Sequence, residues 1–118
     1  IRIDLKTNRV RRTYQAPASL IREYSYFNDM RFNRGKAYIT DAASMEPALV
    51  VLDLKTGQMR RVLNNHPSMI AARRMYADGG RLIRMRDPIP DPKGQMTKDK
   101  YVNVDQLEVS PDGRWLYY

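Results

Sequence analysis

The chain has 118 residues, the size of a single domain, and contains no cysteine, which excludes disulfides and cysteine-ligated zinc. Its 21 Lys and Arg residues outnumber its 13 Asp and Glu residues and give a formal charge of +8. Because the basic residues lie in separate pairs along the chain, we predict a solvated basic surface and no nucleic-acid partner. No apolar run reaches the ~20 residues of a transmembrane helix, so we expect no transmembrane segment.

Residues 1–14, IRIDLKTNRVRRTY, have the pattern of a β-hairpin. Two β-rich runs flank the turn DLKTN, where Asn8 can adopt a positive φ and the Asp4 carboxylate can accept hydrogen bonds from backbone amides. We therefore predict two strands, followed by a crossing over residues 15–28.

The segment 28–64 predicts a complete four-stranded antiparallel sheet. Its last two strands flank DLKTG, a near copy of the first turn, so that Asp53 aligns with Asp4 at an offset of 49 residues and Gly57 takes the turn position that needs a positive φ. The expected strands lie near 29–33, 36–41, 48–54 and 58–64.

Residues 70–100 interrupt this repeat. The run RRMYADGGRLIRM alternates around DGG and predicts a small extra hairpin, whereas DPIPDPKGQ reads as a proline-rich loop. The segment joins an outer strand to the next inner strand, so we expect it at the mouth of a channel. A loop of this length is either a lid over a site or a flap over sheet edges, and its sequence leaves both open.

A repeat of about 50 residues made of hairpins is typical of β-propellers. Residues 28–40 also match 105–118, which predicts two more strands within 104–118. We predict an all-β fold, namely a partial β-propeller made of the outer half of one blade (1–14), a complete blade (28–64) and the inner half of the next (104–118). Because a blade must be covered on both faces, we expect the remaining blades to lie outside this chain, which begins and ends within strands.

Several motifs of the chain resemble the yellow and major royal jelly protein family, in particular its bacterial members. They are FNDMRF, AYITD, ALVVLDLKTGQMRRVL, NHPSM and VDQLEVSPDGRWLYY, and they cover most of the chain outside residues 70–100. The resemblance implies a six-bladed propeller, usually exported and therefore secreted or periplasmic, with a small-molecule site at the mouth of the central channel.

The same blades resemble, more distantly, the gluconolactonase and senescence-marker family. That resemblance implies that Asn28 contacts a substrate and that Asp105 takes the place of a metal-ligating Asn, so that both could serve a divalent cation such as calcium or zinc. An Asp in place of the Asn keeps an oxygen ligand, which a hard cation accepts. The family's other ligands, a Glu and an Asp, would lie in blades outside this chain.

The candidate ligand-binding residues also have structural interpretations. Asn28, Asp29 and Asp105 open the inner strands, where they could bind a ligand or hydrogen-bond the crossing loops, and for Asp29 the structural role is favoured. His66 could reach the channel mouth as a base or ligand, but with no second His and no Cys beside it we favour a loop-organising role.

Three other carboxylates and an aromatic cluster are assigned to structure. Asp4 and Asp53 repeat one another in hairpin turns, and Asp41 ends a strand before AASMEP, so all three are expected in turns. The aromatic residues near the end of the chain are expected to pack between blades instead of forming a ligand cage. They are Trp115, Tyr117 and Tyr118.

Three function classes remain open at this point. The first is a ligand-binding propeller of the yellow and royal jelly type. The second is a metal-dependent lactonase, in which a cation would polarise an ester carbonyl and activate water. The third is a propeller with a purely structural or protein-interaction role.

Overall fold

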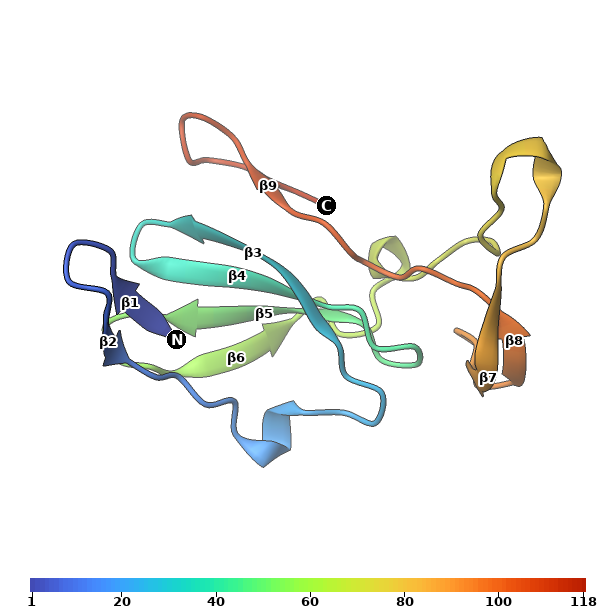
Figure 1. The fold of residues 1–118 in the computed structure, drawn as a ribbon, viewed down its shortest axis with the longest axis horizontal. Coiled ribbons are helices and arrows are strands. Elements are labelled where there is room, and N and C mark those ends of the chain that lie inside the picture. The colour runs from blue at the N-terminus through green and yellow to red at the C-terminus, as the bar shows by residue number, and fades with distance from the viewer.

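The computed structural model describes all of residues 1–118 and is built from β-strands, with no α-helix (Figure 1). A four-stranded antiparallel sheet has the order β3-β4-β5-β6 and is accompanied by three two-stranded sheets. The strands are β1 (Arg2–Asp4), β2 (Arg9–Arg12), β3 (Phe27–Asn33), β4 (Lys36–Asp41), β5 (Ala48–Asp53), β6 (Met59–Val62), β7 (Arg84–Pro90), β8 (Met96–Asp99), β9 (Glu108–Val109) and β10 (Leu116–Tyr117). The predicted all-β fold is confirmed.

Three 3-10 helices, η1 (Ala18–Leu20), η2 (Pro67–Met69) and η3 (Asp78–Gly80), lie in the connections. Each spans three residues, and none has the length or apolar character needed to cross a membrane.

The four-stranded sheet carries apolar side chains on both faces. Successive side chains of a strand point to opposite faces, and in its central strands both sets are apolar. On one face Ile39 and Val50 are buried against Leu20, which lies in η1 within the crossing from β2 to β3. On the other face Leu49 is buried against Met69 and a small cluster from the chain before β9. The sheet therefore forms the middle layer between two neighbouring parts of the chain.

The neighbours of this sheet are the β1–β2 hairpin on one side and the β9–β10 hairpin on the other (Figure 1). The Tyr14 hydroxyl and the Arg12 guanidinium donate to the Leu54 carbonyl, which ties the first hairpin to the turn after β5. Arg31 of β3 pairs with Glu108 of β9, so these two strands lie side by side. In a β-propeller, neighbouring blades stack on one another, and the first strand of each blade lies beside the first strand of the next.

The two repeated turns have the geometry that their sequences predict. Oδ1 of Asp4 accepts from the amides of Lys6 and Thr7 at 3.0 Å each. In the second copy, Oδ1 of Asp53 accepts from the two amides at the equivalent positions, at 2.9 and 2.8 Å. Asn8 has a φ of 53° and Gly57 a φ of 84°, so each supplies the positive φ expected of it.

The prediction that Asp41 lies in a turn is wrong. Asp41 is the last residue of β4 and is fully buried, where its carboxylate pairs with Arg61 and accepts hydrogen bonds from Ser25 Oγ and the Tyr26 amide. Arg61 also donates to the carbonyls of Leu20 and Glu46. A buried carboxylate needs such partners, and this cluster joins the crossing to the end of the sheet.

The hairpin of the 70–100 insertion has a different centre from the predicted one. DGG does reverse the chain, through η3 and a single bridge between Tyr76 and Leu82. The paired strands, however, are β7 and β8, and they flank the turn 91–95 inside the segment expected as a proline-rich loop. Pro88 and Pro90 are compatible with β7 because it lies at a sheet edge, where a missing amide is tolerated.

The aromatic residues near the end of the chain are exposed within residues 1–118. Trp115, Tyr117 and Tyr118 each keep about half or more of their surface accessible, and Leu116 is the side chain of β10 that packs on the core. The guanidinium of Arg114 lies 5.8 Å from the Trp115 ring centre.

Candidate functional site

A β-bulge places two of the candidate residues at the start of β3. Phe27 pairs with Asp41 and Met30 pairs with Ile39, so both Asn28 and Asp29 oppose the single residue Thr40. The Asp29 amide donates to the Thr40 hydroxyl at 3.0 Å instead of to a backbone carbonyl. Bulges of this kind redirect side chains at the ends of strands.

Thr40 also links this bulge to the chain that leads into β9. Its hydroxyl donates to the Asp105 carbonyl at 2.6 Å while accepting from Asp29. The start of β3, the end of β4 and the residues before β9 therefore meet at one end of the stacked sheets. The structure thus brings the segments carrying Asn28, Asp29 and Asp105 together.

The side chains of Asn28 and Asp105 have no hydrogen-bond partner within the chain. Asn28 is exposed and Asp105 is half-buried. An amide and a carboxylate are therefore available for a bound molecule at this end of the sheets.

Asp29 has a structural role, because both of its carboxylate oxygens make contacts within the chain. Its Oδ2 accepts from the Leu107 amide at 2.8 Å, and its Oδ1 pairs with Arg31 and accepts from the Met30 amide. The Leu107 amide, followed by the Met30 amide and Arg31, lowers the pKa of Asp29 below its usual value. Asp29 is therefore an ionised clamp between β3 and the chain entering β9.

His66 organises the loop after β6. Its ring precedes η2 as the N-cap, with Nδ1 2.7 Å from Ser68 Oγ, and Ser68 Oγ lies 2.9 Å from the Tyr118 hydroxyl. The structure records no contact between His66 and Asn28 or Asp105. The hydrogen bonds of His66 and Ser68 do not reach the Thr40 network.

The residues present do not by themselves fit a metal centre. No group of three or more His, Cys, Asp or Glu side chains in residues 1–118 could hold a metal ion. Asn28 and Asp105 offer two oxygen donors, whereas calcium takes six to eight and zinc about four. Asp29 cannot add a third, because its oxygens are occupied by amides and Arg31.

Thr40 and Arg31 are the residues at this site that the sequence reasoning missed. A threonine inside the strand KAYITD carries no signal that separates a bridging hydroxyl from an ordinary strand residue. The alternation of FNDMRFN does place Asp29 and Arg31 on one face, and that pairing could have been found.

A family model described as Major royal jelly protein matches residues 1–118. A search of curated proteins found no significant match.

Proposed function

Because the chain belongs to the major royal jelly protein family, we propose that it forms part of a β-propeller that binds a small molecule at the mouth of its central channel. Members of this family are β-propellers, and the four-stranded sheet with a neighbour on each face is consistent with a part of one. Our proposal places the ligand at the end of the sheets where Asn28 and Asp105 lie.

One observation supports this proposal most strongly. The backbones around Asn28 and Asp105 are held together through Thr40, while the two side chains have no partner within the chain. Ligand sites favour polar groups held on a rigid backbone, because the backbone then loses little conformational entropy when the ligand binds. The ligand we expect is small and carries hydrogen-bonding or positively charged groups.

The test is a ligand-observed NMR screen of the intact protein against sugar lactones, small organic cations and neutral aromatic compounds. The expected result is binding that falls about 10-fold in Asn28→Ala and in Asp105→Ala, as one lost hydrogen bond to a charged or polar group would give. Asp87→Ala, on an exposed part of β7, is the control that should change nothing. Retained binding in the double variant would contradict the proposal.

The lactonase alternative stays a prediction, and no contact in residues 1–118 favours it. A divalent ion at this place would need ligands besides Asn28 and Asp105. We propose an exported protein, secreted or periplasmic, because export is usual in the family that the chain belongs to.

A further inference from the structure

Three pairs of adjacent arginines occur in the chain, and the fold holds them differently. They are Arg11–Arg12, Arg60–Arg61 and Arg73–Arg74, and no other two basic residues are adjacent in the sequence. One class of serine protease recognises such pairs, with an acidic pocket that binds the second basic side chain. The structure determines which of the three pairs such an enzyme could reach in the folded protein.

The first two pairs are held by the sheets. Arg12 is the last residue of β2, and its guanidinium donates to the carbonyls of Leu54 and Lys55 at 3.2 and 2.8 Å. Arg61 lies in β6 with 6% of its side chain exposed, where it pairs with Asp41. A protease could bind either arginine only after a strand had left its sheet.

The third pair lies outside any strand or helix. Arg73 and Arg74 are exposed, and the backbone amides and carbonyls of residues 72–74 make no hydrogen bond within the chain. A bound peptide that adds to an enzyme as an extended strand pairs its own backbone groups with those of the enzyme. Residues 72–74 have these groups free, and exposed segments of this kind are the preferred sites of proteolytic cleavage.

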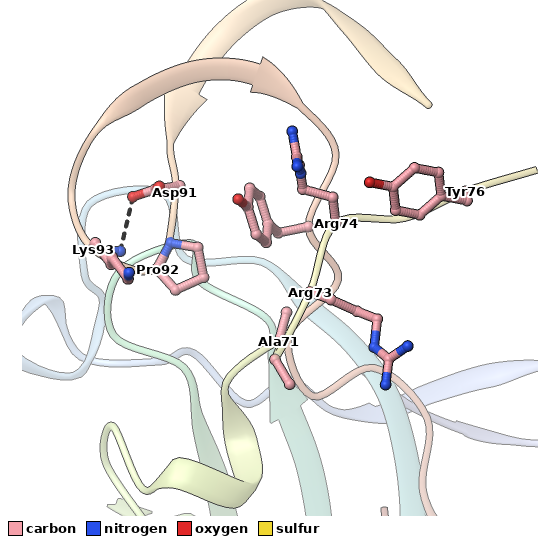
Figure 2. Close-up of a pocket in the computed structure, with 9 residues that line it drawn as sticks. Ala71, Arg73, Arg74, Tyr76, Asp91, Pro92 and Lys93 are labelled. Carbon is pink, nitrogen blue, oxygen red and sulfur yellow. Dashed lines mark hydrogen bonds between the residues drawn. The ribbon is translucent and has the colours of Figure 1, made fainter. Parts of the chain in front are cut away.

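The side chains of this pair are also open to a partner. Figure 2 shows the chain running from Ala71 through Arg73 and Arg74 to Tyr76, with the two guanidinium groups pointing in different directions. A cavity of about 500 Å³, lined by both arginines, leaves space beside this segment. Since neighbouring subsites of a protease receive side chains from alternate sides of an extended peptide, this arrangement suits the binding of both arginines.

Two contacts hold the downstream side of the pair. Nη1 of Arg74 lies 3.1 Å from Oδ2 of Asp99, and the Met75 amide donates to the Lys100 carbonyl at 2.7 Å. Arg74 keeps 47% of its side chain exposed and Met75 is 44% exposed. Exposed ion pairs contribute little to stability, so a local opening of this segment gives access without unfolding the sheet.

We propose that Arg73–Arg74 is a processing site, at which a protease specific for paired basic residues cuts the folded protein between Arg74 and Met75. One water molecule adds across this peptide bond, which leaves a carboxylate on Arg74 and an ammonium group on Met75. The cut leaves the β7–β8 hairpin covalently attached through its C-terminal end alone. This site does not depend on the ligand site at the channel mouth.

The two fragments should remain associated after the cut, because hydrogen bonds join them on both sides of the insertion. The Val104 amide donates to the Met69 carbonyl at 2.8 Å, and the Leu107 amide donates to the Asp29 carboxylate at 2.8 Å. Cleavage therefore frees one end of the insertion while the stacked sheets keep their contacts.

The test is limited digestion of the intact native protein with a kexin-type serine protease, which cuts after paired basic residues. Mass spectrometry should find that the first cut within residues 1–118 creates a new N-terminus at Met75, and the fragments should elute together in size-exclusion chromatography. Arg74→Gln should slow this cut at least about 100-fold, because the acidic pocket loses its cationic partner. Asp99→Asn should accelerate it about 2- to 5-fold by releasing the Arg74 side chain.

The matched control is Arg60→Gln, which changes an exposed arginine of a pair that β6 holds in the sheet. It should leave the rate of the cut after Arg74 unchanged. Native cleavage after Arg12 or Arg61 that is as fast as cleavage after Arg74 would overturn the proposal. So would a native protein that resists cleavage after Arg74 while the urea-unfolded protein is cut at all three pairs.

Discussion

Asp53 shows how one carboxylate fixes a hairpin turn that recurs in the chain. The amides of Thr56 and Lys55 point at it, and Lys36 lies 3.4 Å from its Oδ2. The Thr56 amide is the largest cause that lowers the pKa of Asp53 from 3.8 to about 2. The two amide contacts recur at Asp4, where the amides of Lys6 and Thr7 donate to the carboxylate, so the turn chemistry repeats with the sequence.

The lowered pKa makes Asp53 a source of acid sensitivity. A carboxyl with a lower pKa in the folded state stabilises the protein above its unfolded pKa, and this contribution is lost as the pH falls from about 4 to about 2. In urea unfolding of the intact protein, Asp53→Asn should be less stable than wild type at pH 6, and the difference should shrink by pH 2.5. A constant deficit in Asp53→Asn across this pH range would contradict the assignment.

The buried pair of Asp41 and Arg61 gives a second residue-level prediction. Arg61 keeps 6% of its side chain exposed and Asp41 none, so removing the guanidinium leaves a buried, uncompensated carboxylate. Arg61→Ala should cost roughly 3–5 kcal/mol of unfolding free energy, measured with urea at neutral pH. Arg60→Ala, one residue away on the exposed face of β6, should cost little. Equal small losses would show that the pair does not anchor the crossing.

At the scale of elements, the contact between the first hairpin and the four-stranded sheet can be measured at Gly57. A Cβ there would lie 2.8 Å from Nη2 of Arg12, which donates to the carbonyls of residues 54–56. Gly35 also has a positive φ, but a Cβ there meets open space. A substitution by alanine therefore carries the cost of a positive φ at both glycines, but it disturbs a contact with Arg12 only at Gly57.

Gly35→Ala should lose about 1–2 kcal/mol through φ alone. Gly57→Ala should lose about 1 kcal/mol more, because the Arg12 hydrogen bonds are displaced. Urea unfolding of both variants, with and without Arg12→Ala, separates the two effects. The extra loss should disappear in the Arg12→Ala background, and its persistence would contradict a role for Arg12 in holding the hairpin.

The sequence predicts elements well where local rules are strong, and less well where tertiary contacts decide. The strands of the middle sheet and the Asp4 and Asp53 turns follow from alternation and turn chemistry. The β7–β8 hairpin was missed because prolines at 88 and 90 suggest a loop, although an edge strand tolerates them. Asp41 was misassigned since its partner, Arg61, lies 20 residues away and no local pattern marks the pair.

The same limit applies to the candidate site. The opening positions of the inner strands, Asn28 and Asp105, could be chosen from the repeat. The Thr40 hydroxyl that joins the Asp29 amide to the Asp105 carbonyl could not, because Thr40 and Asp105 are 65 residues apart.

At the scale of the whole molecule, apolar side chains remain uncovered on one face of the four-stranded sheet. Phe32 is 63% exposed and Met30 41% exposed, and both line an apolar groove of about 500 Å³ beside the first hairpin. A propeller blade is covered on both faces, so we expect this groove to be filled in the intact protein.

Two substitutions test that expectation. Phe32→Asp should destabilise the intact protein by roughly 3–5 kcal/mol, as a polar change in a covered apolar site would. Leu5→Asp, on a turn residue that is 88% exposed, should change stability by less than about 0.5 kcal/mol. A small effect at both positions in urea unfolding would mean that the groove stays open.

We propose that residues 1–118 are neighbouring blades of one propeller, with Asn28 and Asp105 beside one another at the channel mouth. A crystal structure of the intact protein is the decisive measurement. We expect a closed ring of blades, a filled groove at Phe32, and both side chains facing one central channel. Side chains of Asn28 and Asp105 on opposite surfaces, or no channel between the first strands, would contradict it.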